Sequence, residues 1–472
     1  MHMPSFFRSR RVVLSLVSAL LLSAPVCHAA AAVGAPAGAA DPAAFAPRDL
    51  KEVSPRDGLP RFFRKLEDGK AVRIGYLGGS ITAQKGWRVQ SRAWLQKQFP
   101  KAQIEEINAA IGGTGSDLGV FRVQSDVLDR KPDLLFVEFA VNDAGASPDR
   151  IRKAMEGIVR KTWRAVPDCD IAFVYTITKN DIAVLRTGKM KRSESVMEDV
   201  ADHYGIPSIH LGVEVVRLEA EGKLVMASPD ALVERPSGDE LDVSSGIPTD
   251  GEGRILFSKD GVHPYLDTGH ALYTQAIIRS IPAIRAAGGK SSQSSARTLP
   301  APLVADNWEN ARMLPFGATP ATIGIRIDGP ATLLDPATDS RARSFASRLP
   351  DLWKLEPGAT LRFRFRGTRA AVYDLLGPDC GALRVTIDGA TTGKRRFDGY
   401  CTYHRLGTLV LGDGLPDAEH TVEVTVLADG VDKKNVLFER NRDDFDKSPE
   451  KYAGSNWYAG ALFLLGEPVG LE

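Results

Sequence analysis

The sequence has no excess of charge of either sign, since 60 lysines and arginines stand against 59 aspartates and glutamates, a net charge of +1. Proteins that bind nucleic acid carry a basic stripe or patch, and this chain has no basic stripe or polybasic tail. Beyond its N-terminus the chain also lacks an apolar run long enough to span a bilayer. We therefore expect no nucleic acid partner and no stable membrane insertion of the mature chain.

Cysteine is scarce, with 4 in 472 residues, and neither a Cys-x-x-Cys motif nor a His/Cys cluster is present. Zinc sites depend on such motifs, so we expect no metal. Cys380 and Cys401 lie in the same later region and can form a disulfide if the protein is exported, with Cys169 left as a lone thiol. The alternative, in which all three are reduced and packed, stays equally open.

The N-terminus has the features of an export signal. Arg8, Arg10 and Arg11 form a positive region, Val12 to Val26 is a short apolar stretch, and small residues suited to cleavage follow. We predict a signal peptide over 1–29 and a flexible Ala/Gly/Pro-rich segment over 30–56. The mature protein is expected to be exported, either periplasmic or secreted.

At 472 residues the chain is too long for one ordinary domain, and two are expected. In its first half, apolar strand-like runs alternate with amphipathic segments of helical spacing. The runs predict strands at 72–78, 103–108, 133–141, 170–178 and 206–211, and helices at 57–69, 87–99, 116–128, 148–165 and 193–204. This alternation predicts an α/β domain over 57–287 with a parallel, three-layer sheet. The segment 225–259 breaks the rhythm and is expected to be a long loop or a hairpin.

A serine follows the first strand directly, in the turn Gly78-Gly79-Ser80. The glycines let the backbone turn tightly and leave room around the serine. The carboxyl end of a strand is also where open α/β sheets build their active sites. Ser80 is therefore a candidate nucleophile, although a serine at this position often serves only as the N-cap of the next helix.

Two further loops follow predicted strands and are expected at the same edge of the sheet. One contains Gly112-Gly113 and the other Asn142-Asp143. The glycine cluster does not have the G-x-G-x-x-G spacing of a dinucleotide site, so we reject that function. An Asn-Asp pair after a strand is by itself usually just a turn.

The motif Asp260-x-x-His263-Pro264 completes a set that acyl transfer requires: a nucleophile, a base, an orienting acid and donors for an oxyanion. We predict that Ser80 attacks, that His263 takes its proton, and that Asp260 fixes the tautomer of His263. The predicted oxyanion hole consists of the backbone N–H groups of Ser80 and Gly113 and the side-chain amide of Asn142. Without such neighbours, His203, His210 and His270 are taken as structural.

These four motifs, in this order, resemble the SGNH hydrolases, the GDSL-like esterases. The matching blocks are 77–82, 108–113, 139–143 and 260–264, so the resemblance covers about 72–287. It implies a flavodoxin-like sheet, no cofactor and ester hydrolysis. The chain departs from the family pattern at Gly79, where aspartate is usual, and at Ala140, where glycine is usual; both changes leave the catalytic groups in place.

The second half has a different pattern, after a Gly/Ser-rich linker over 288–304. Short alternating segments at 360–367, 382–389 and 420–426, with a further apolar run at 461–465, predict an all-β sandwich of jelly-roll type over 305–472. Such modules resemble those appended to carbohydrate esterases. Aromatic residues that are candidates for stacking on sugar rings, or alternatively for core packing, are Trp308, Trp353, Tyr400, Tyr403 and Trp457.

Together these features predict an exported serine esterase that removes O-acetyl groups from a polysaccharide or oligosaccharide through an acyl-serine intermediate. The ester hydrolase follows from the four motifs and from the family that they resemble. The carbohydrate substrate follows by analogy from export, from the appended module and from the absence of an apolar lid segment. A lipase, a thioesterase or a broad carboxylesterase is the alternative among enzymes. Acetyl transfer to a glycan, and a non-catalytic glycan-binding protein with a vestigial hydrolase domain, also stay open.

Overall fold

The computed structural model describes residues 45–229, 246–289, 297–428 and 430–470. Residues 42–472 belong to one compact unit. The expected signal peptide over 1–29, and residues 30–44 of the segment expected to be flexible, lie outside the described residues. Among the residues that are described, no helix has the length and the apolar character needed to cross a membrane.

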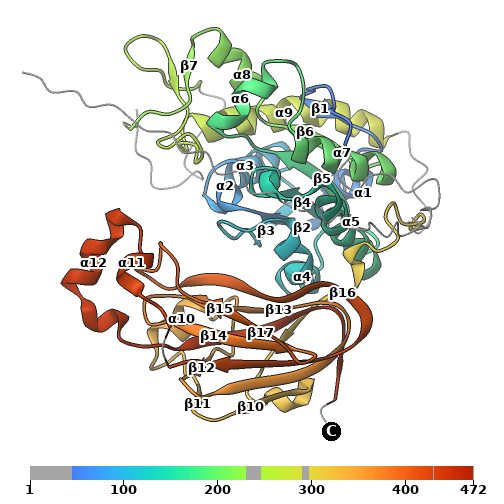
Figure 1. The fold of residues 1–472 in the computed structure, drawn as a ribbon. Coiled ribbons are helices and arrows are strands. Elements are labelled where there is room, and N and C mark those ends of the chain that lie inside the picture. Colours follow the sequence, from blue (N-terminus) through green and yellow to red (C-terminus); the bar gives the residue numbers. More distant parts are fainter. Residues whose placement is uncertain (1–44, 230–245, 290–296, 429, 471–472) are drawn as a thin grey trace, which may run out of the picture. The chain divides into compact units, whose positions relative to one another are not determined.

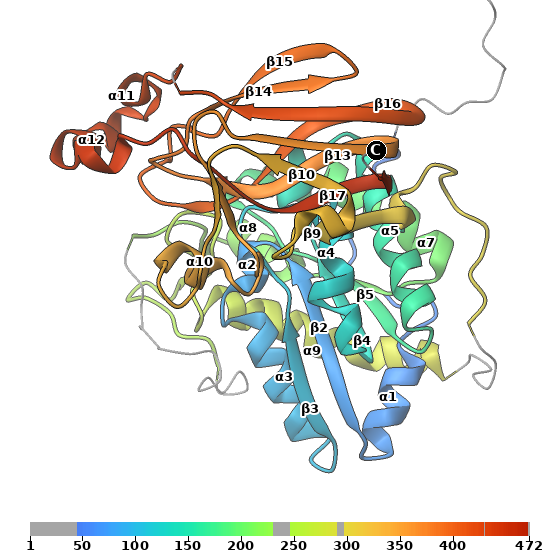
Figure 2. The same cartoon turned by 90° about the horizontal axis from the view of Figure 1, so that it is seen from below.

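The first part of the chain builds a six-stranded sheet in the order β1-β6-β5-β4-β2-β3. Its strands are β1 (Val53–Ser54), β2 (Ala71–Gly78), β3 (Gln103–Asn108), β4 (Leu134–Glu138), β5 (Asp170–Tyr175) and β6 (Ser208–His210). The ladder is parallel from β3 to β6, and β1 joins it antiparallel at the edge. Figure 2 shows β3, β2 and β4 side by side. The predicted flavodoxin-like parallel sheet is confirmed, and with β1 it includes residues from the segment expected to be flexible.

Helices cover both faces of this sheet (Figure 1). They are α1 (Pro60–Glu67), α2 (Ser80–Ala83), α3 (Trp87–Gln98), α4 (Ser116–Asp126), α5 (Pro148–Ala165), α6 (Ile182–Leu185), α7 (Arg192–Tyr204), α8 (Val213–Ala220) and α9 (Gly269–Gly288). Alternate residues of β4 separate the two cores: Leu135 and Val137 pack with α4, α5 and α7, whereas Leu134 and Phe136 pack with α1, α3 and α9. This is the three-layer arrangement that the sequence predicts.

The segment expected to be a long loop or a hairpin carries a short parallel pair instead of a hairpin. β7 (Leu224–Val225) pairs with β8 (Ile255–Leu256) in parallel register. A hairpin would bring the two strands together antiparallel. Between the two strands, residues 230–245 lie outside the described part of the chain.

The second part of the chain is all-β in its core, as predicted. Nine strands form one antiparallel sheet: β9 (Ala311–Pro315), β10 (Ile325–Asp328), β11 (Ala331–Leu333), β12 (Trp353–Leu355), β13 (Thr360–Leu376), β14 (Ala382–Ile387), β15 (Ala390–Arg395), β16 (Arg405–Val426) and β17 (Trp457–Val469). Short helices α10 (Ser340–Phe345), α11 (Lys433–Val436) and α12 (Arg442–Lys447) lie in its connections. Side chains of β10, β12, β13, β14, β16 and β17 meet in one buried cluster, so the sheet curves around its own core.

A second cluster joins this β region to the hydrolase region. Phe121 of α4 stacks on Phe463 of β17 at 5.0 Å between ring centroids, and Phe463 stacks on Tyr373 of β13 at 5.1 Å. The described part of the linker is also held in place, because Arg297 donates to Cys169 O at 2.6 Å and to Asp170 Oδ1 at 3.0 Å. The domain boundaries 57–287, 288–304 and 305–472 stay predictions.

The cysteines of the described chain are all free and buried: Cys169, Cys380 and Cys401. The disulfide between Cys380 and Cys401 that the sequence leaves open is therefore not formed in this structure. Burial raises the pKa of the Cys169 and Cys380 thiols well above their ordinary value. These thiols are poor nucleophiles, because it is the thiolate that reacts.

Candidate active site

The serine turn begins where β2 ends at Gly78 and passes into α2 at Ser80. A Cβ on Gly78 would lie 2.8 Å from the backbone oxygen of Glu138, so only glycine fits there. The N-cap of α2 is Gly79, and no side chain caps this helix. The interpretation of Ser80 as a capping residue is therefore wrong. The Ser80 hydroxyl instead lies 2.9 Å from His263 Nε2.

His263 lies in an exposed loop together with Asp260, with side-chain exposures of 41% and 50%. His263 Nδ1 is 2.7 Å from Asp260 Oδ2. Partial burial opposes ionisation of Asp260, but hydrogen bonds from the His263 ring and from the backbone N–H groups of His263 and Val262 outweigh it and lower its pKa to about 2. An ionised carboxylate can only accept, so Nδ1 carries the proton of the neutral ring and Nε2 is free to accept from Ser80.

The loop is held against the hydrolase core by backbone contacts. Gly261 adopts a φ of +81°, which glycine tolerates without strain. Its carbonyl accepts from Lys179 N at 2.7 Å, and its N–H donates to Ser258 Oγ at 2.8 Å. These contacts place the Asp260–His263 segment beside the serine turn, although the two are 183 residues apart in sequence.

The glycine and asparagine loops also meet at the serine turn. Ile111 N donates to Gly78 O at 3.0 Å, and a Cβ on Gly112 would lie 3.4 Å from Ser80 Cβ. A Cβ on Gly79 would lie 2.0 Å from Asn142 Oδ1, so the asparagine side chain occupies the space that the missing Cβ leaves. The structure thus brings the four predicted motifs together, while the roles of Gly113 and Asn142 as oxyanion donors stay predictions.

Two buried carboxylates near the site carry no assigned role in the sequence-based prediction. Asp143 Oδ1 accepts from Ser116 N at 3.0 Å and so ties the glycine loop to the asparagine loop. Burial raises the pKa of Asp143 to about 7, although hydrogen bonds from Ser116 oppose the shift. Glu138 ends β4 and contacts the serine turn. In the sequence, each of these carboxylates is recognisable as an acidic residue within or directly after an apolar strand. This position indicates that the carboxylate is buried, but it does not show which residue it contacts.

The three histidines that are predicted to be structural do not belong to the Ser80–His263–Asp260 chain of hydrogen bonds. His203 Nε2 lies 2.8 Å from Ala301 O, and the buried His210 lies 3.1 Å from Glu194 Oε2. His270 is fully buried, and this burial lowers its pKa to about 3. In the described part of the chain, Asp379, Cys380 and His404 could together hold a metal ion. However, the Asp379 carboxylate already contacts Arg341 and His404, and the Cys380 thiol has a raised pKa.

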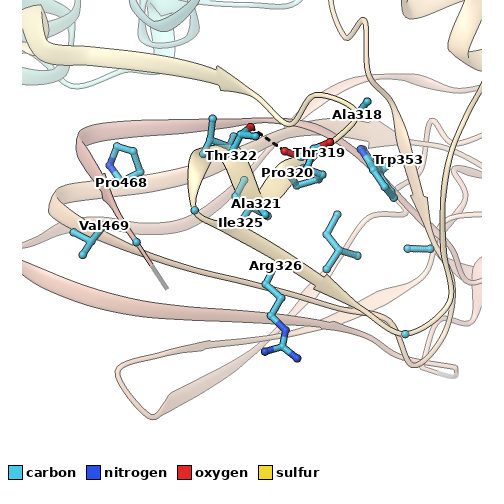
Figure 3. Close-up of a pocket in the computed structure, with 16 residues that line it drawn as sticks. Ala318, Thr319, Pro320, Ala321, Thr322, Ile325, Arg326, Trp353, Pro468 and Val469 are labelled. Atoms are coloured by element: carbon cyan, nitrogen blue, oxygen red, sulfur yellow. Dashed lines mark hydrogen bonds between the residues drawn. The ribbon is translucent and has the colours of Figure 1, made fainter. Parts of the chain in front are cut away.

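The candidate aromatic residues of the second half differ in burial and form three groups. Trp308 and Trp457 are buried in the core. Trp353 is half-buried, donates from Nε1 to Gly317 O at 3.0 Å, and lines a cavity of about 760 Å³ with Pro468 and Val469 (Figure 3). Tyr400 and Tyr403 are exposed, at 49% and 58%. Tyr400 and Tyr403 are thus the most exposed of these five aromatic residues.

Tyr400 belongs to an exposed aromatic patch with Phe438, whose ring centroid lies 4.7 Å away. Arg405 lies over the Tyr400 ring at 5.8 Å, and Arg440 lies over both rings. Arg405 also lines a cleft of about 430 Å³ that Gly113, Thr114, Gly115 and Asp117 border from the glycine loop. Arg405 thus contacts both the cleft beside the glycine loop and the aromatic patch.

Comparisons with known proteins agree with this geometry. Residues 76–264 match the model of the GDSL-like Lipase/Acylhydrolase family. An uncharacterized lipoprotein, YqeF, of Bacillus subtilis (strain 168) is 38% identical over 64 residues, which are 11% of this chain and 26% of that protein. The chain therefore spans about a quarter of the length of this curated relative.

Two solved structures of a two-domain esterase (CEX) active on acetylated mannans align with TM-scores of 0.64, at 19% and 18% identity. Each alignment covers 89% of this chain and 98% of the esterase chain. The first of the two esterase structures was co-crystallized with mannopentaose. At this level of identity the likeness shows a shared fold across both regions. Residues 76–264 of this chain therefore match a GDSL-like lipase/acylhydrolase domain, and this match supports a carboxylic ester hydrolase.

Proposed function

We propose that this protein is an exported serine esterase that removes O-acetyl groups from a polysaccharide or oligosaccharide. One observation carries the reaction type: Ser80 Oγ, His263 Nε2, His263 Nδ1 and Asp260 Oδ2 form a hydrogen-bonded chain with steps of 2.9 and 2.7 Å. A nucleophile in contact with a base, and a base oriented by a carboxylate, is the arrangement that acyl transfer requires.

In the acylation half of the reaction, Ser80 Oγ attacks the carbonyl carbon of the acetyl group and His263 Nε2 accepts the Ser80 proton. The carbonyl oxygen becomes an oxyanion, which the N–H groups of Ser80 and Gly113 and the amide of Asn142 stabilise. The first N–H groups of a helix have no intrahelical partner, so Ser80 N is available for this role. The C–O bond to the sugar then breaks, and His263 returns the proton to the departing sugar oxygen.

In the deacylation half, a water molecule attacks the acetyl-serine. His263 accepts a proton from this water, acetate leaves, and the same proton restores the Ser80 hydroxyl. Asp260 remains ionised throughout, because its pKa of about 2 lies far below the working pH. Its charge stabilises the imidazolium that forms twice in each cycle.

The carbohydrate substrate rests on three supports. The fold likeness extends over both regions of a two-domain esterase active on acetylated mannans. The cleft beside the glycine loop is lined partly by residues of the β region, including Arg396 and Arg405. Arg405, which lines this cleft, also lies over the exposed Tyr400 ring, and Tyr400 contacts Phe438. Aromatic faces suit the apolar faces of sugar rings.

Acetate release from a panel of acetylated plant and bacterial polysaccharides tests the proposal, with Ser80→Ala as the control. We expect one glycan class to release acetate with wild type and none to do so with Ser80→Ala. Hydrolysis of a small aryl acetate without release from any glycan would refute the carbohydrate substrate and direct attention to lipids and thioesters. Activity retained by purified Ser80→Ala would refute the serine mechanism.

A further inference from the structure

A buried glutamate lies directly behind the serine turn. Glu138 is the last residue of β4, pairs with Gly78 of β2 in the parallel ladder, and is only 1% exposed. A carboxylate so deeply buried is costly unless hydrogen bonds compensate it. Its contacts therefore indicate what this position does.

Three donors surround the Glu138 carboxylate. Thr82 Oγ1 donates to Oε2 at 2.7 Å, and Thr176 Oγ1 donates to Oε1 at 2.7 Å. The backbone N–H of Gly79 also bonds to this carboxylate. Burial raises the pKa of Glu138 above its ordinary value, while these three hydrogen bonds act in the opposite direction. Gly79 and Thr82 flank Ser80, so two of the three contacts fix the turn that carries the serine.

This turn needs external support. α2 has only four residues, and a helix of one turn is not stable by itself. Two glycines precede the serine and impose little restraint on the backbone. On the far side, Arg88 Nε donates to Thr82 O at 3.0 Å and so holds the end of α2. The beginning of the turn is held by Glu138, which accepts from Gly79 N, and by Ile111, whose N–H donates to Gly78 O at 3.0 Å.

We propose that Glu138 is a positioning residue for the reaction: its carboxylate fixes the Gly79–Thr82 turn so that Ser80 Oγ meets His263 Nε2. The inference rests on the proposed role of Ser80 as nucleophile. A nucleophile displaced by about 1 Å can lose on the order of a hundredfold in rate. Glutamate suits this place because a carboxylate offers only acceptors to three donors. Glutamine would turn an NH₂ group toward one of them.

Glu156 provides a matched control within the same chain. It is fully buried in α5 and also accepts from three donors: Tyr204 OH at 2.6 Å, Leu303 N at 2.6 Å and Val304 N at 2.8 Å. These contacts tie the segment after α9 to α5 and include none of the predicted catalytic residues. Glu156→Gln therefore reports the cost of neutralising a buried glutamate without disturbing the serine turn.

The test compares Glu138→Gln with Glu156→Gln in the full chain. Three quantities are measured: Tm, kcat and KM for 4-nitrophenyl acetate, and the rate of inactivation by diethyl 4-nitrophenyl phosphate, which phosphorylates an activated serine. For Glu138→Gln we expect kcat and the inactivation rate to fall at least about tenfold with KM changed less than about twofold. Glu156→Gln should lower Tm and leave both rates per folded enzyme unchanged. Wild-type rates in Glu138→Gln would overturn the proposal.

A second pair of variants serves if Glu138→Gln does not fold. Thr82→Val removes the contact on the turn side, and Thr176→Val removes the contact on the opposite side of the same carboxylate. We expect Thr82→Val to slow inactivation several times more than Thr176→Val, and equal effects would contradict a positioning role. A wild-type enzyme that the phosphate does not modify would instead overturn the nucleophile assignment, and this inference with it.

Discussion

The two sides of the candidate active site are built differently. The serine turn is anchored from behind by buried groups: Glu138 accepts from Gly79 N and from Thr82 Oγ1, and Arg88 donates to Thr82 O. The side chains of Asp260 and His263 are about half exposed to solvent, and the backbone of Gly261 links their loop to Lys179 and Ser258 of the hydrolase region. The serine side is thus preorganised by the core, whereas the histidine side depends on a few local contacts.

This difference gives Asp260 two tasks. Its Oδ1 accepts from the backbone N–H groups of Val262 and His263 at 2.9 and 2.8 Å, and its Oδ2 orients the His263 ring. One carboxylate therefore shapes the loop and sets the tautomer. On the serine side these tasks are divided among several buried residues.

The largest effects are expected on the histidine side. His263→Ala should lower kcat at least about 10⁴-fold, because the base is lost, and Asp260→Asn should follow with a comparable loss, because the tautomer and the loop both change. Steady-state hydrolysis of 4-nitrophenyl acetate measures both. His203→Ala is the control, since this exposed histidine contacts only the carbonyl of Ala301 among the hydrogen bonds described. An Asp260→Asn variant with near-normal kcat would show that the loop holds His263 unaided.

A smaller effect is expected from Gly79→Ala on the serine side. The new methyl would lie 2.0 Å from Asn142 Oδ1, so the asparagine must move and the predicted oxyanion hole is disturbed. Loss of one oxyanion donor typically costs about a hundredfold or more in kcat, and we expect a loss between about tenfold and a hundredfold. Gly393→Ala is the control, because nothing lies within 4 Å of its added Cβ. An unaffected kcat in Gly79→Ala would exclude Asn142 from the oxyanion hole.

The pH dependence of stability distinguishes the two sides further. The pKa of Asp143 is raised to about 7 in the folded protein, from an ordinary value of 3.8. Between these values the folded state binds the extra proton, so stability falls as pH rises from about 4 to 7. Asp143→Asn removes this loss and keeps an acceptor for Ser116 N.

Thermal unfolding of Asp143→Asn and wild type at pH 5 and pH 8 checks this expectation. The variant should gain in Tm relative to wild type on going from pH 5 to pH 8. For Asp260 the sign is opposite: its lowered pKa favours folding above about pH 4, and this contribution is lost as pH falls toward 2. A Tm difference for Asp143→Asn that stays constant between pH 5 and pH 8 would contradict the buried-carboxylate account.

The smallest effect concerns the β region. Tyr400→Ala should raise KM for an acetylated polysaccharide several-fold and leave kinetics on 4-nitrophenyl acetate unchanged, because an exposed ring can contribute about 1 kcal/mol to binding. Val184→Ala is the control, since this exposed apolar residue lies in the hydrolase region. Identical KM values for the polysaccharide would remove the aromatic patch from substrate binding.

The sequence predicts the hydrolase fold closely because its periodicity is strong there. The helix expected over 148–165 coincides with α5, and the strand expected over 103–108 coincides with β3. The site motifs are also recognisable in the sequence. Three of them directly follow predicted strands, and in the fourth Asp260 and His263 are only three residues apart. Glu138 was not recognisable as a positioning residue, because its partners Thr82 and Thr176 lie on other elements of the chain.

The β region was predicted less completely, for a physical reason. The strand expected over 360–367 extends as β13 to Leu376 through an irregularity between Gly367 and Arg369. Beyond this irregularity both faces of β13 are buried, so the alternation of apolar and polar residues disappears. Part of this burial is against Phe463 of β17, which stacks on both Tyr373 of β13 and Phe121 of α4. Separation of the β region from α4 would expose the Phe463 and Tyr373 rings.

The most direct test of the account is to locate the reactive serine. Wild-type protein is treated with diethyl 4-nitrophenyl phosphate, digested, and analysed by mass spectrometry for the modified peptide. The account predicts a single adduct on Ser80, its loss in Ser80→Ala, and a strongly reduced rate of formation in His263→Ala. An adduct on another serine, or an adduct on Ser80 that forms equally fast without His263, would contradict it.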